Sequence, residues 1–446
     1  MNLCIIGAGH VGLVTGACFA EIGNQVICVD NDEEKIRMIE RGKMPMYEPD
    51  LEELVRRNVD QGKLSFSTSV AEGTVRSQVI FIAVGTPPKE DGEADLSSVE
   101  KVCREIAKNA KEYKLIVEKS TVPVQTGQWI KHVVQLGNNQ VDFDIASNPE
   151  FLREGSAVRD FLNPDRIVIG VETERAAEIL KQLYQPIINR AFDSRLNISV
   201  SGSDPVPLVV TDIQSSEIIK HASNSFLATK ISFINAVADL CEKAGADVEK
   251  VAEGMGCDAR IGSSFLNAGV GFGGFCFPKD LQAFIHIAEK LNYDFTLLKE
   301  VQRINRERPR QLVRKLEEAL WILKDKTIGI LGLSFKPDTD DMRFAPSIQV
   351  INLLKKEGAK VKAYDPVAMP NAKALLNNIE YVKDPYEAAS GSDALVIITE
   401  WEEFKKLDLK KIKGLLETPV IVDGRNIYDP REMHKLGFIY KSIGKG

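Results

Sequence analysis

A glycine-rich turn near the start of the chain constrains the fold more than any other feature. Gly7, Gly9 and Gly12 follow the apolar residues 3–6 and open an amphipathic helix pattern. In such a unit the first glycine permits a tight turn and the second lets backbone approach a pyrophosphate. The third allows close packing of helix on strand. The motif therefore predicts a strand–turn–helix unit that binds phosphate at the helix start.

The second strand pattern ends in Asp30, eighteen residues after Gly12. An acidic side chain at this point accepts hydrogen bonds from ribose hydroxyls and disfavours a 2′-phosphate, which predicts NAD in preference to NADP. An ordinary βαβ turn with an acidic strand end is the alternative, because glycines occur in many turns. The residues of this motif that we assign to the cofactor are Gly7, Gly9, Val11, Gly12 and Asp30.

Strand and helix patterns alternate along two parts of the chain. Strands are predicted at residues 3–8, 26–30, 79–84, 115–119, 143–147 and 167–171, and again at 327–333, 360–364, 394–399 and 419–423. Between the two parts, residues 212–244 contain no proline or glycine, which predicts one unusually long helix. We therefore expect an α/β protein with two Rossmann-like, doubly wound domains, whose parallel sheets are joined by a long central helix. The expected bounds are 1–200, 201–308 and 309–446.

Composition mainly excludes classes of protein. The 446 residues carry a net charge of −7, without the basic face typical of nucleic-acid binding. No apolar run is long enough for a membrane span, and the N-terminus lacks the pattern of a signal peptide. The seven cysteines and five histidines are scattered without metal-ligand spacing. We expect a cytoplasmic protein with no metal site, no disulfide framework, no nucleic-acid partner and no membrane contact.

One cysteine differs from the other six. Cys276 follows the glycine-rich run at residues 271–274 and precedes Pro278, which suits the first turn of a helix. A helix N-terminus and the nearby Lys279 both favour a thiolate, which could attack a carbonyl carbon. Asp280 could act as a base or orient water. A buried structural cysteine after a glycine-rich turn remains the alternative.

Other candidate residues lie on the central helix and at strand ends. Lys220 and Asn224 are four apart on the predicted helix, so they share a face and could stabilise an oxyanion, unless they belong to an ordinary solvated face. His221 is expected to point elsewhere and to be structural. Glu150 and Glu154 follow a predicted strand, where they could transfer protons or contact a cofactor. Polar turns such as those with Thr86 and Thr121 have the simpler interpretation that they end strands.

Taken in order, these motifs resemble the UDP-glucose/GDP-mannose dehydrogenase family over essentially the whole chain. The motifs are GAGHVG at 7–12, VGTP at 84–87, STVP at 120–123, NPEFL at 148–152, residues 217–224, GGFC at 273–276, PKD at 278–280, GLSFK at 332–336 and DDMR at 340–343. The resemblance implies an N-terminal NAD domain, a central helix used in dimerisation and a C-terminal domain that holds a nucleotide. Phe275 departs from the small residue that usually precedes the cysteine in this family.

The resemblance also implies an activity, which is four-electron oxidation of a nucleotide-sugar C6 alcohol through a thiohemiacetal and a thioester on Cys276. Lys220 and Asn224 match an oxyanion-stabilising pair, Asp280 a water-orienting carboxylate, Glu150 a proton-transfer group and Thr121 a residue that places water near the nicotinamide. Positions that match cofactor contacts are Lys35, Thr86, Thr121, Glu154, Lys279 and Arg343. Positions that match substrate contacts are Glu150, Phe151, Leu152, Arg153, Glu154, Lys220, Asn224, Arg260, Phe265, Leu266, Asn267, Ala268, Gly269, Gly273 and Lys336, with Arg260 reaching a neighbouring subunit.

The alternatives differ in substrate and in class. Arg260, Ile261 and Gly262 with Phe265 and Leu266 look more like the UDP-glucose branch than the GDP-mannose branch, and the UDP-N-acetylhexosamine dehydrogenases usually differ in the cysteine loop. A two-electron dehydrogenase of the 3-hydroxyacyl or 6-phosphogluconate type would not need that loop. A non-catalytic NAD-binding module would be expected to lack Cys276, Lys220 or Asp280. The resemblance and the long helix together predict a homodimer.

Overall fold

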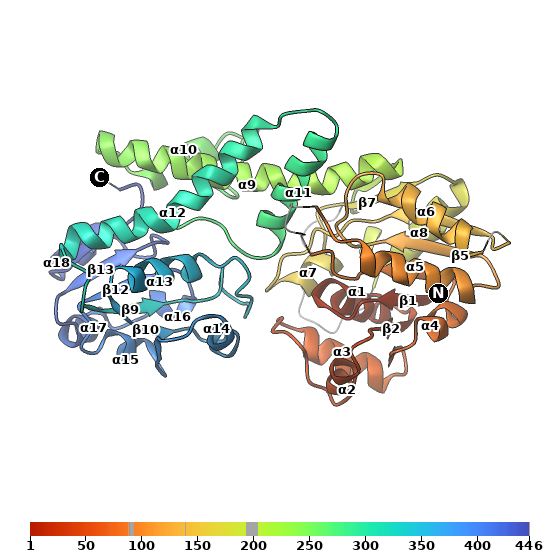
Figure 1. Cartoon of the computed structure of the whole chain (residues 1–446), viewed down its shortest axis with the longest axis horizontal. Helices are drawn as coiled ribbons and strands as arrows, with labels where there is room; N and C mark the ends of the chain where they lie inside the picture. The colour runs from red at the N-terminus through yellow and green to blue at the C-terminus, as the bar shows by residue number, and fades with distance from the viewer. Residues whose placement is uncertain (88, 90–92, 139, 193–203, 446) are drawn as a thin grey trace. The chain divides into compact units, whose positions relative to one another are not determined.

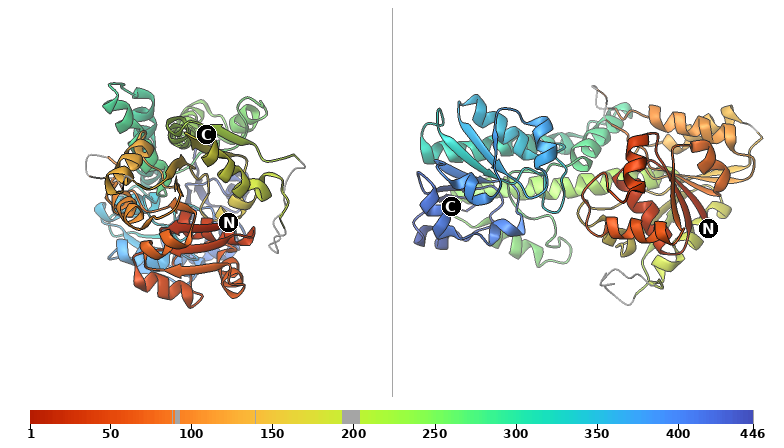
Figure 2. Two further views of the ribbon diagram at one scale, coloured as in Figure 1. Left: turned by 90° about the vertical axis from the view of Figure 1, so that its right-hand side faces the viewer. Right: turned by 90° about the horizontal axis from the view of Figure 1, so that it is seen from below.

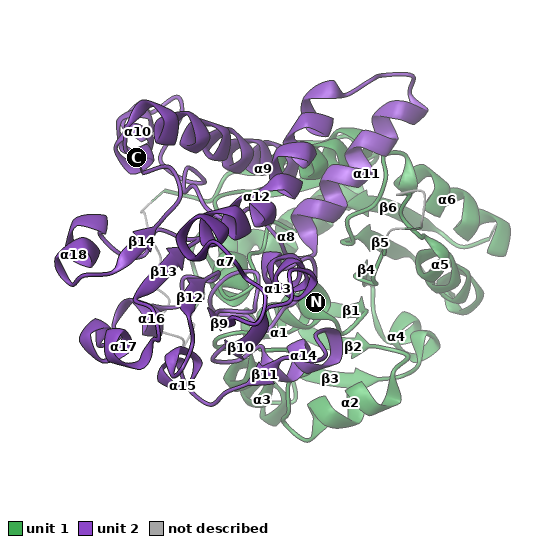
Figure 3. Cartoon of the chain, turned by 60° about the vertical axis from the view of Figure 1, so that its left-hand side comes forward, with its two compact units in different colours: residues 1–223 green, residues 224–446 purple. Residues whose placement is uncertain are grey.

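A computed structural model describes residues 1–87, 89, 93–138, 140–192 and 204–445. The chain divides into two compact units, residues 1–223 and 224–446 (Figure 3). The predicted domain boundary between residues 200 and 201 lies outside the described residues. Each unit contains a sheet with helices on its faces (Figures 1 and 2), which confirms the predicted fold class of two Rossmann-like α/β parts.

The first unit is built on an eight-stranded sheet with the order β3-β2-β1-β4-β5-β6-β7-β8. Neighbouring strands are parallel except for β6 and β7, and the first six positions have the doubly wound order of a dinucleotide-binding fold. The strands are β1 (Asn2–Ile6), β2 (Gln25–Val29), β3 (Leu64–Ser67), β4 (Val79–Ile82), β5 (Lys114–Glu118), β6 (Phe143–Ser147), β7 (Ile167–Val171) and β8 (Leu208–Thr211). Neither β3 nor β8 was predicted from the sequence.

Side chains of successive strand residues enter two different cores. Leu3 and Ile5 of β1 belong to one apolar cluster, whereas Cys4 and Ile6 belong to another. Because side chains alternate across a strand, a sheet covered on both faces needs apolar residues at nearly every position. The helices of this unit are α1 (His10–Glu21), α2 (Glu33–Glu40), α3 (Leu51–Asp60), α4 (Val70–Arg76), α5 (Ser97–Asn109), α6 (Thr126–Gly137), α7 (Ala157–Leu162) and α8 (Glu174–Ile188).

The second unit contains a six-stranded parallel sheet with the order β11-β10-β9-β12-β13-β14. Its strands are β9 (Thr327–Leu331), β10 (Lys360–Tyr364), β11 (Glu380–Tyr381), β12 (Ala394–Ile397), β13 (Val420–Asp423) and β14 (Ile439–Lys441). Its helices are α10 (Val248–Gly256), α11 (Cys276–Lys290), α12 (Thr296–Leu320), α13 (Pro346–Lys356), α14 (Met369–Leu375), α15 (Pro385–Ala389), α16 (Glu402–Lys405), α17 (Leu409–Leu415) and α18 (Pro430–Lys435). The short edge strands β11 and β14 were not predicted.

Helix α9 (Ile213–Ala244) contains 32 residues and continues from the first unit into the second. Its length confirms the single long helix predicted from the absence of proline and glycine. Among the described residues, no helix is long and apolar enough to cross a membrane. Lys220 and Asn224 both lie on α9, four residues apart in the sequence.

Candidate active site

The glycine-rich turn has the geometry that its sequence predicts. Gly7 has φ +107°, and a Cβ added there would lie 2.5 Å from the Ala83 carbonyl oxygen. A Cβ on Gly12 would lie 1.7 Å from the Gly7 carbonyl oxygen, so α1 can approach the turn only with glycine here. Around Gly9, by contrast, no atom lies within 4 Å of such a Cβ. The backbone at Gly9 is therefore open to a ligand at the start of α1.

A cavity of about 390 Å³ lies beside this turn, and Gly7, Gly9, Asp30, Lys35 and Gly85 are among its lining residues. The Asp30 carboxylate accepts hydrogen bonds from the Ala8 amide at 2.8 Å and from Lys35 Nζ at 2.8 Å. Burial opposes ionisation of Asp30, but bonds from Lys35 and from backbone amides lower its pKa below the ordinary value. An open glycine backbone beside an ionised acceptor fits the pyrophosphate and the ribose of a dinucleotide.

Asp30→Asn tests this fit. Hydrogen bonds to a charged acceptor contribute about 1.5–3 kcal/mol, so we expect the Kd for NAD to rise roughly 10- to 150-fold. The preference for NAD over NADP should fall as well, because the charge that repels a 2′-phosphate is removed while Lys35 stays. Isothermal titration with both dinucleotides measures the two effects, and Asp60→Asn at the exposed end of α3 is the control. An unchanged Kd would exclude Asp30 from the cofactor site.

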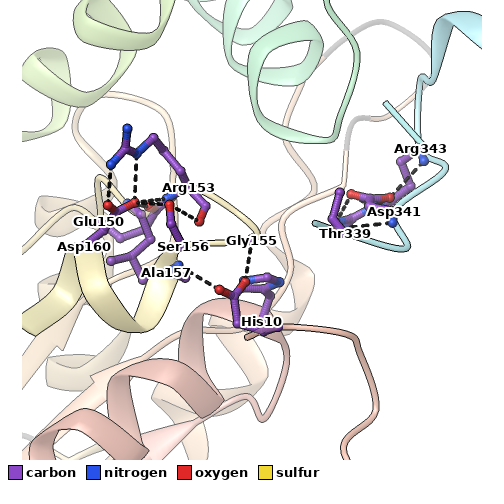
Figure 4. Close-up of polar contacts among 12 residues, drawn as sticks. His10, Glu150, Arg153, Gly155, Ser156, Ala157, Asp160, Thr339, Asp341 and Arg343 are labelled. Carbon is purple, nitrogen blue, oxygen red and sulfur yellow. Dashed lines mark hydrogen bonds and ion pairs between the residues drawn. The ribbon is translucent and has the colours of Figure 1, made fainter. Parts of the chain in front are cut away.

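A buried carboxylate that was not predicted connects the turn to a distant loop. Glu48 Oε2 lies 2.8 Å from His10 Nε2, and the Glu48 carboxylate accepts the Gly155 and Ala157 amides at 2.7 and 2.8 Å. Figure 4 labels His10, Gly155 and Ala157. Burial opposes protonation of His10, but the bond to Glu48 and the nearby carboxylates raise its pKa above the ordinary value. Glu48 lies in the irregular segment between α2 and α3, and the local sequence gives no signal of these long-range contacts.

The structure brings Glu150 and Lys220 together inside the first unit. Lys220 Nζ donates to Glu150 Oε1 at 2.9 Å and to the Glu150 carbonyl oxygen at 2.6 Å. The two side chains are only 4% and 5% exposed. Glu150 Oε2 also accepts the Leu152 amide at 2.7 Å, which folds the loop after β6 around this carboxylate. A buried lysine on a carboxylate can hold or move a proton beside a substrate.

Lys119 is a second buried lysine near this pair, and it was not singled out from the sequence. Its Nζ donates to Asn148 Oδ1 at 3.0 Å, and the Tyr184 hydroxyl donates to the same oxygen at 2.6 Å. Burial lowers the pKa of Lys119 to about 7, with Glu150 opposing the shift and Lys220 adding to it. Because the sequence around Lys119 resembles a polar turn at a strand end, its burial was visible only in the fold.

The remaining candidates of the first unit are distributed around these groups. The Thr86 hydroxyl donates to the Thr121 carbonyl oxygen at 2.8 Å, so two of the predicted cofactor positions touch each other. Phe151 lies under two cations, with Arg166 Cζ 3.6 Å and Lys220 Nζ 5.5 Å from its ring centre. Arg153 is instead exposed and ion-paired with Asp160 at 2.6 Å (Figure 4).

In the second unit, Cys276 is the first residue of α11, as the position of Pro278 predicts. Its side chain is partly exposed, and Asp280 lies one turn further along the same helix. Asn224 Nδ2 donates to Asp280 Oδ2 at 2.6 Å, and Lys279 Nζ lies 3.0 Å from Asp280 Oδ1. A thiol, an amide and a carboxylate are thus brought to one end of α11.

Phe275, the residue that departs from the family pattern, contacts two of the predicted cofactor positions. Lys279 Nζ lies 5.4 Å and Arg343 Cζ 4.3 Å from its ring centre. Arg343 is also held by Asp341 through an ion pair of 2.7 Å (Figure 4). Since a cation over an aromatic face is attracted to it, Phe275 provides a packing surface for both side chains.

The loop before the cysteine is fixed by backbone contacts. Asn305 Oδ1 accepts the Phe272 amide at 2.8 Å, and its Nδ2 donates to the Phe272 carbonyl at 3.0 Å. A Cβ on Gly273 would lie 2.4 Å from the Phe344 carbonyl oxygen, so this position needs glycine. Asn305 was missed because it lies on α12 in an ordinary charged helix sequence.

The predicted substrate positions of the second unit differ in exposure. Leu266, Ala268, Gly269 and Gly273 are buried, whereas Phe265 and Lys336 are partly exposed. Asn267 is exposed on the same loop, and Arg260 is 89% exposed with an ion pair to Asp258 at 2.6 Å. The structure therefore does not bring Arg260 to the other candidate residues of its own unit.

The fold and the cofactor cavity define the class of protein, which is a dinucleotide-binding α/β protein with a cysteine at the start of a helix in its second unit. Sequence profiles of the UDP-glucose/GDP-mannose dehydrogenase family match its NAD binding domain at residues 1–188, its central domain at 214–307 and its UDP binding domain at 329–430. The chain belongs to this family of NAD-dependent nucleotide-sugar dehydrogenases.

Individual relatives agree with this assignment. The UDP-glucose 6-dehydrogenase TuaD of Bacillus subtilis is 47% identical over 446 residues, which cover all of this chain and 93% of the relative. The structure of a UDP-glucose dehydrogenase from Pyrobaculum islandicum is 39% identical with a TM-score of 0.89, covering 99% of this chain and 96% of that one. A UDP-D-ManNAc dehydrogenase from Pyrococcus horikoshii is 27% identical with a TM-score of 0.85 and full coverage of both chains.

Proposed function

We propose that this protein oxidises the C6 alcohol of UDP-glucose to the carboxylate of UDP-glucuronate and forms two NADH per substrate. The single observation that carries the four-electron assignment is the position of Cys276 at the start of α11, one turn before an Asp280 that is hydrogen-bonded to Asn224. A two-electron oxidation to an aldehyde or ketone needs no nucleophile. Oxidation from aldehyde to acid in one pocket does need a covalent bond between a nucleophile and the carbonyl carbon.

The side chains have the following proposed roles. NAD, when bound, supplies the hydride acceptor for both oxidations. The Glu150–Lys220 pair takes the proton from the C6 hydroxyl, and Thr121 places water near the nicotinamide. Cys276 Sγ then bonds to the aldehyde carbon to give a thiohemiacetal, while Lys220 and Asn224 donate to the oxygen that becomes negative. After the second oxidation, water oriented by Asp280 cleaves the thioester and returns the thiol.

The binding residues are proposals of the same kind. We assign the cofactor to the glycine-rich turn and to the cavity that Lys35 lines. From the resemblance to the family, we also assign Glu154, Lys279 and Arg343 to the cofactor. The sugar and nucleotide are assigned to residues 150–154, to the loop at 265–269, to Gly273 and to Lys336. We also propose the division of the chain into an NAD domain at 1–200, a central segment at 201–308 and a nucleotide-sugar domain at 309–446.

A substrate panel tests the proposed function. We expect UDP-glucose to give two NADH per molecule consumed. GDP-mannose and UDP-N-acetylmannosamine should react much more slowly, since the sequence motifs and the relatives favour UDP-glucose. NADH absorbance together with chromatography of the acid product measures both quantities. One NADH per substrate would contradict the thioester route, and preference for another sugar nucleotide would reassign the substrate.

A homodimer is proposed from one face of α9. Ile218, Phe226, Phe233 and Leu240 are spaced eight, seven and seven residues apart and are 42%, 65%, 52% and 65% exposed. Large apolar side chains at this spacing form a stripe along the helix, which is typical of a surface that packs on another helix. Sedimentation at working concentration tests the dimer, and a monomer would refute it.

A cytoplasmic location is proposed from the cysteines. None of the seven, which all lie in the described part of the chain, is joined in a disulfide. Reduced thiols and a nucleophilic cysteine suit a reducing compartment. Non-reducing mass spectrometry of protein purified from cells tests this, and a native disulfide would contradict it.

A further inference from the structure

Two carboxyl groups that the proposed mechanism does not use are buried against each other. Glu118 is the last residue of β5, Glu217 lies near the start of α9, and each residue is 3% exposed. Each carboxyl group lies within hydrogen-bonding reach of the other. Because an ionised carboxylate can only accept hydrogen bonds, a bond between two carboxyl groups requires that one of them carries a proton.

The surroundings place this proton on Glu118. Glu217 Oε2 accepts the Gln125 amide at 2.6 Å and Oε1 accepts the Gly127 amide at 2.8 Å, which favours the ionised form of Glu217. Glu118 Oε2 has no hydrogen-bond partner within the described ranges of the chain. Burial first, and then the neighbouring Glu217, raise the pKa of Glu118 well above its ordinary value.

Few other titratable groups face the pair. Glu118 lies in register between Ile82 of β4 and Ser147 of β6, neither of which titrates. Cys103 of α5 faces Glu118, and burial together with that carboxyl raises the pKa of its thiol to about 12. From the start of α6, only backbone amides reach Glu217. The pair therefore has no cation facing it among these contacts.

The pair holds one end of the segment that carries Thr121. This segment joins β5 to α6 and ends at Gln125, which has φ +77° and donates its amide to Glu217. The Val122 carbonyl oxygen lies 2.7 Å from His221 Nε2, and the Thr121 carbonyl accepts the Thr86 hydroxyl. Since a left-handed backbone is unfavourable for a glutamine, this conformation depends on the contacts that hold it.

We propose that Glu118 and Glu217 share one proton and act together as the positioning pair of the Thr121 segment. Glu217 holds the segment through two amides, and protonated Glu118 donates to Glu217 and prevents repulsion between buried charges. Loss of the proton to solvent would leave two adjacent carboxylates and weaken the hydrogen bond between Glu217 and the Gln125 amide. The link to catalysis rests on the proposed function, in which Thr121 orders water. The shared proton itself does not depend on the proposed function.

Three variants separate this proposal from a merely structural role. Glu118→Gln keeps a donor toward Glu217 and cannot ionise, whereas Glu118→Leu removes the donor; we expect the glutamine to restore most of the kcat that the leucine loses. Glu217→Gln replaces one of the two accepting oxygens by an NH2 group, so one backbone donor loses its acceptor. Misplacing the segment should then lower kcat on the order of 100-fold with a smaller change in KM. Glu52→Gln on the exposed face of α3 is the matched control.

The shared proton has two readouts that need no substrate. At neutral pH the infrared spectrum should contain the carbonyl band of a protonated carboxylic acid, which Glu118→Gln removes and Glu52→Gln retains. The unfolding free energy of the wild type should fall as pH rises from the ordinary glutamate pKa toward the raised folded pKa of Glu118, because only the unfolded chain releases the proton. This slope should be smaller in Glu118→Gln.

Each outcome decides the proposal. A missing band in the wild type, or an equal pH slope in wild type and Glu118→Gln, would overturn the shared proton even if the enzyme oxidises UDP-glucose. Full activity of Glu217→Gln would overturn the positioning role. If the wild type shows the band and the slope but does not oxidise UDP-glucose, the proposed function fails and the shared proton stands.

Discussion

Replacing Cys276 by alanine is expected to abolish formation of the acid, with a loss of kcat of at least about 10⁴-fold, the scale of removing a nucleophile that acts with its partners. The cysteine is partly exposed at the start of α11, so alanine removes the sulfur without opening a buried cavity. The fold and the NAD cavity of the first unit should be unaffected. Product chromatography, together with NADH titration, separates lost chemistry from lost binding.

Cys276→Ser makes the test sharper. Serine keeps the size and the helix start, but its hydroxyl is a much weaker nucleophile than a thiolate at neutral pH. We expect the acid to form very slowly through an ester that mass spectrometry can trap as an adduct at residue 276. Cys257→Ala is the control, because Cys257 is exposed in the same unit at the end of α10. Normal turnover by Cys276→Ala would show the covalent route to be wrong.

Lys220→Met is expected to lower kcat by about 10²–10³-fold and to destabilise the protein by about 3–5 kcal/mol. The activity falls because the donor to the developing oxyanion is lost. The stability falls because Glu150 remains a buried carboxylate without its partner, after losing bonds of 2.9 and 2.6 Å. Steady-state kinetics and denaturant unfolding measure the two effects separately.

A double variant distinguishes the two causes. Glu150→Gln in the Lys220→Met background removes the uncompensated charge, so the unfolding free energy should recover while kcat stays low. Lys230→Met is the control on the same helix, since Lys230 is only partly buried and donates to backbone carbonyls of Ile261 and Gly262. If Lys220→Met kept wild-type activity, Lys220 would be a structural residue alone.

Prediction from the sequence succeeded where a signal is local and continuous. The uninterrupted run at 212–244 predicted α9, and Pro278 predicted the helix that begins at Cys276. The edge strand β3, only four residues long, was missed because LSFS is too short to stand out from its surroundings. Strand β8 was missed for the same reason, with four residues directly before the long helix.

The buried polar groups were much harder to predict. Lys119 lies next to Glu118 in a run that looks like an ordinary polar turn, yet both are buried. Glu48 accepts hydrogen bonds from the Gly155 and Ala157 amides, which are more than 100 residues away in the sequence. Their partners come from distant elements, so no periodicity or spacing near these residues reports their burial or their pKa.

The sequence by itself determined the fold class, the glycine-rich turn with Asp30, the long helix and the cysteine at the start of α11, because each leaves a continuous pattern along the chain. Only the tertiary structure decided that Lys220 pairs with Glu150, that Asn224 meets Asp280 and that Glu118 lies against Glu217. These contacts join residues 56 to 99 positions apart. Such pairs form when sheet and helices pack, and burial then sets which groups keep their protons.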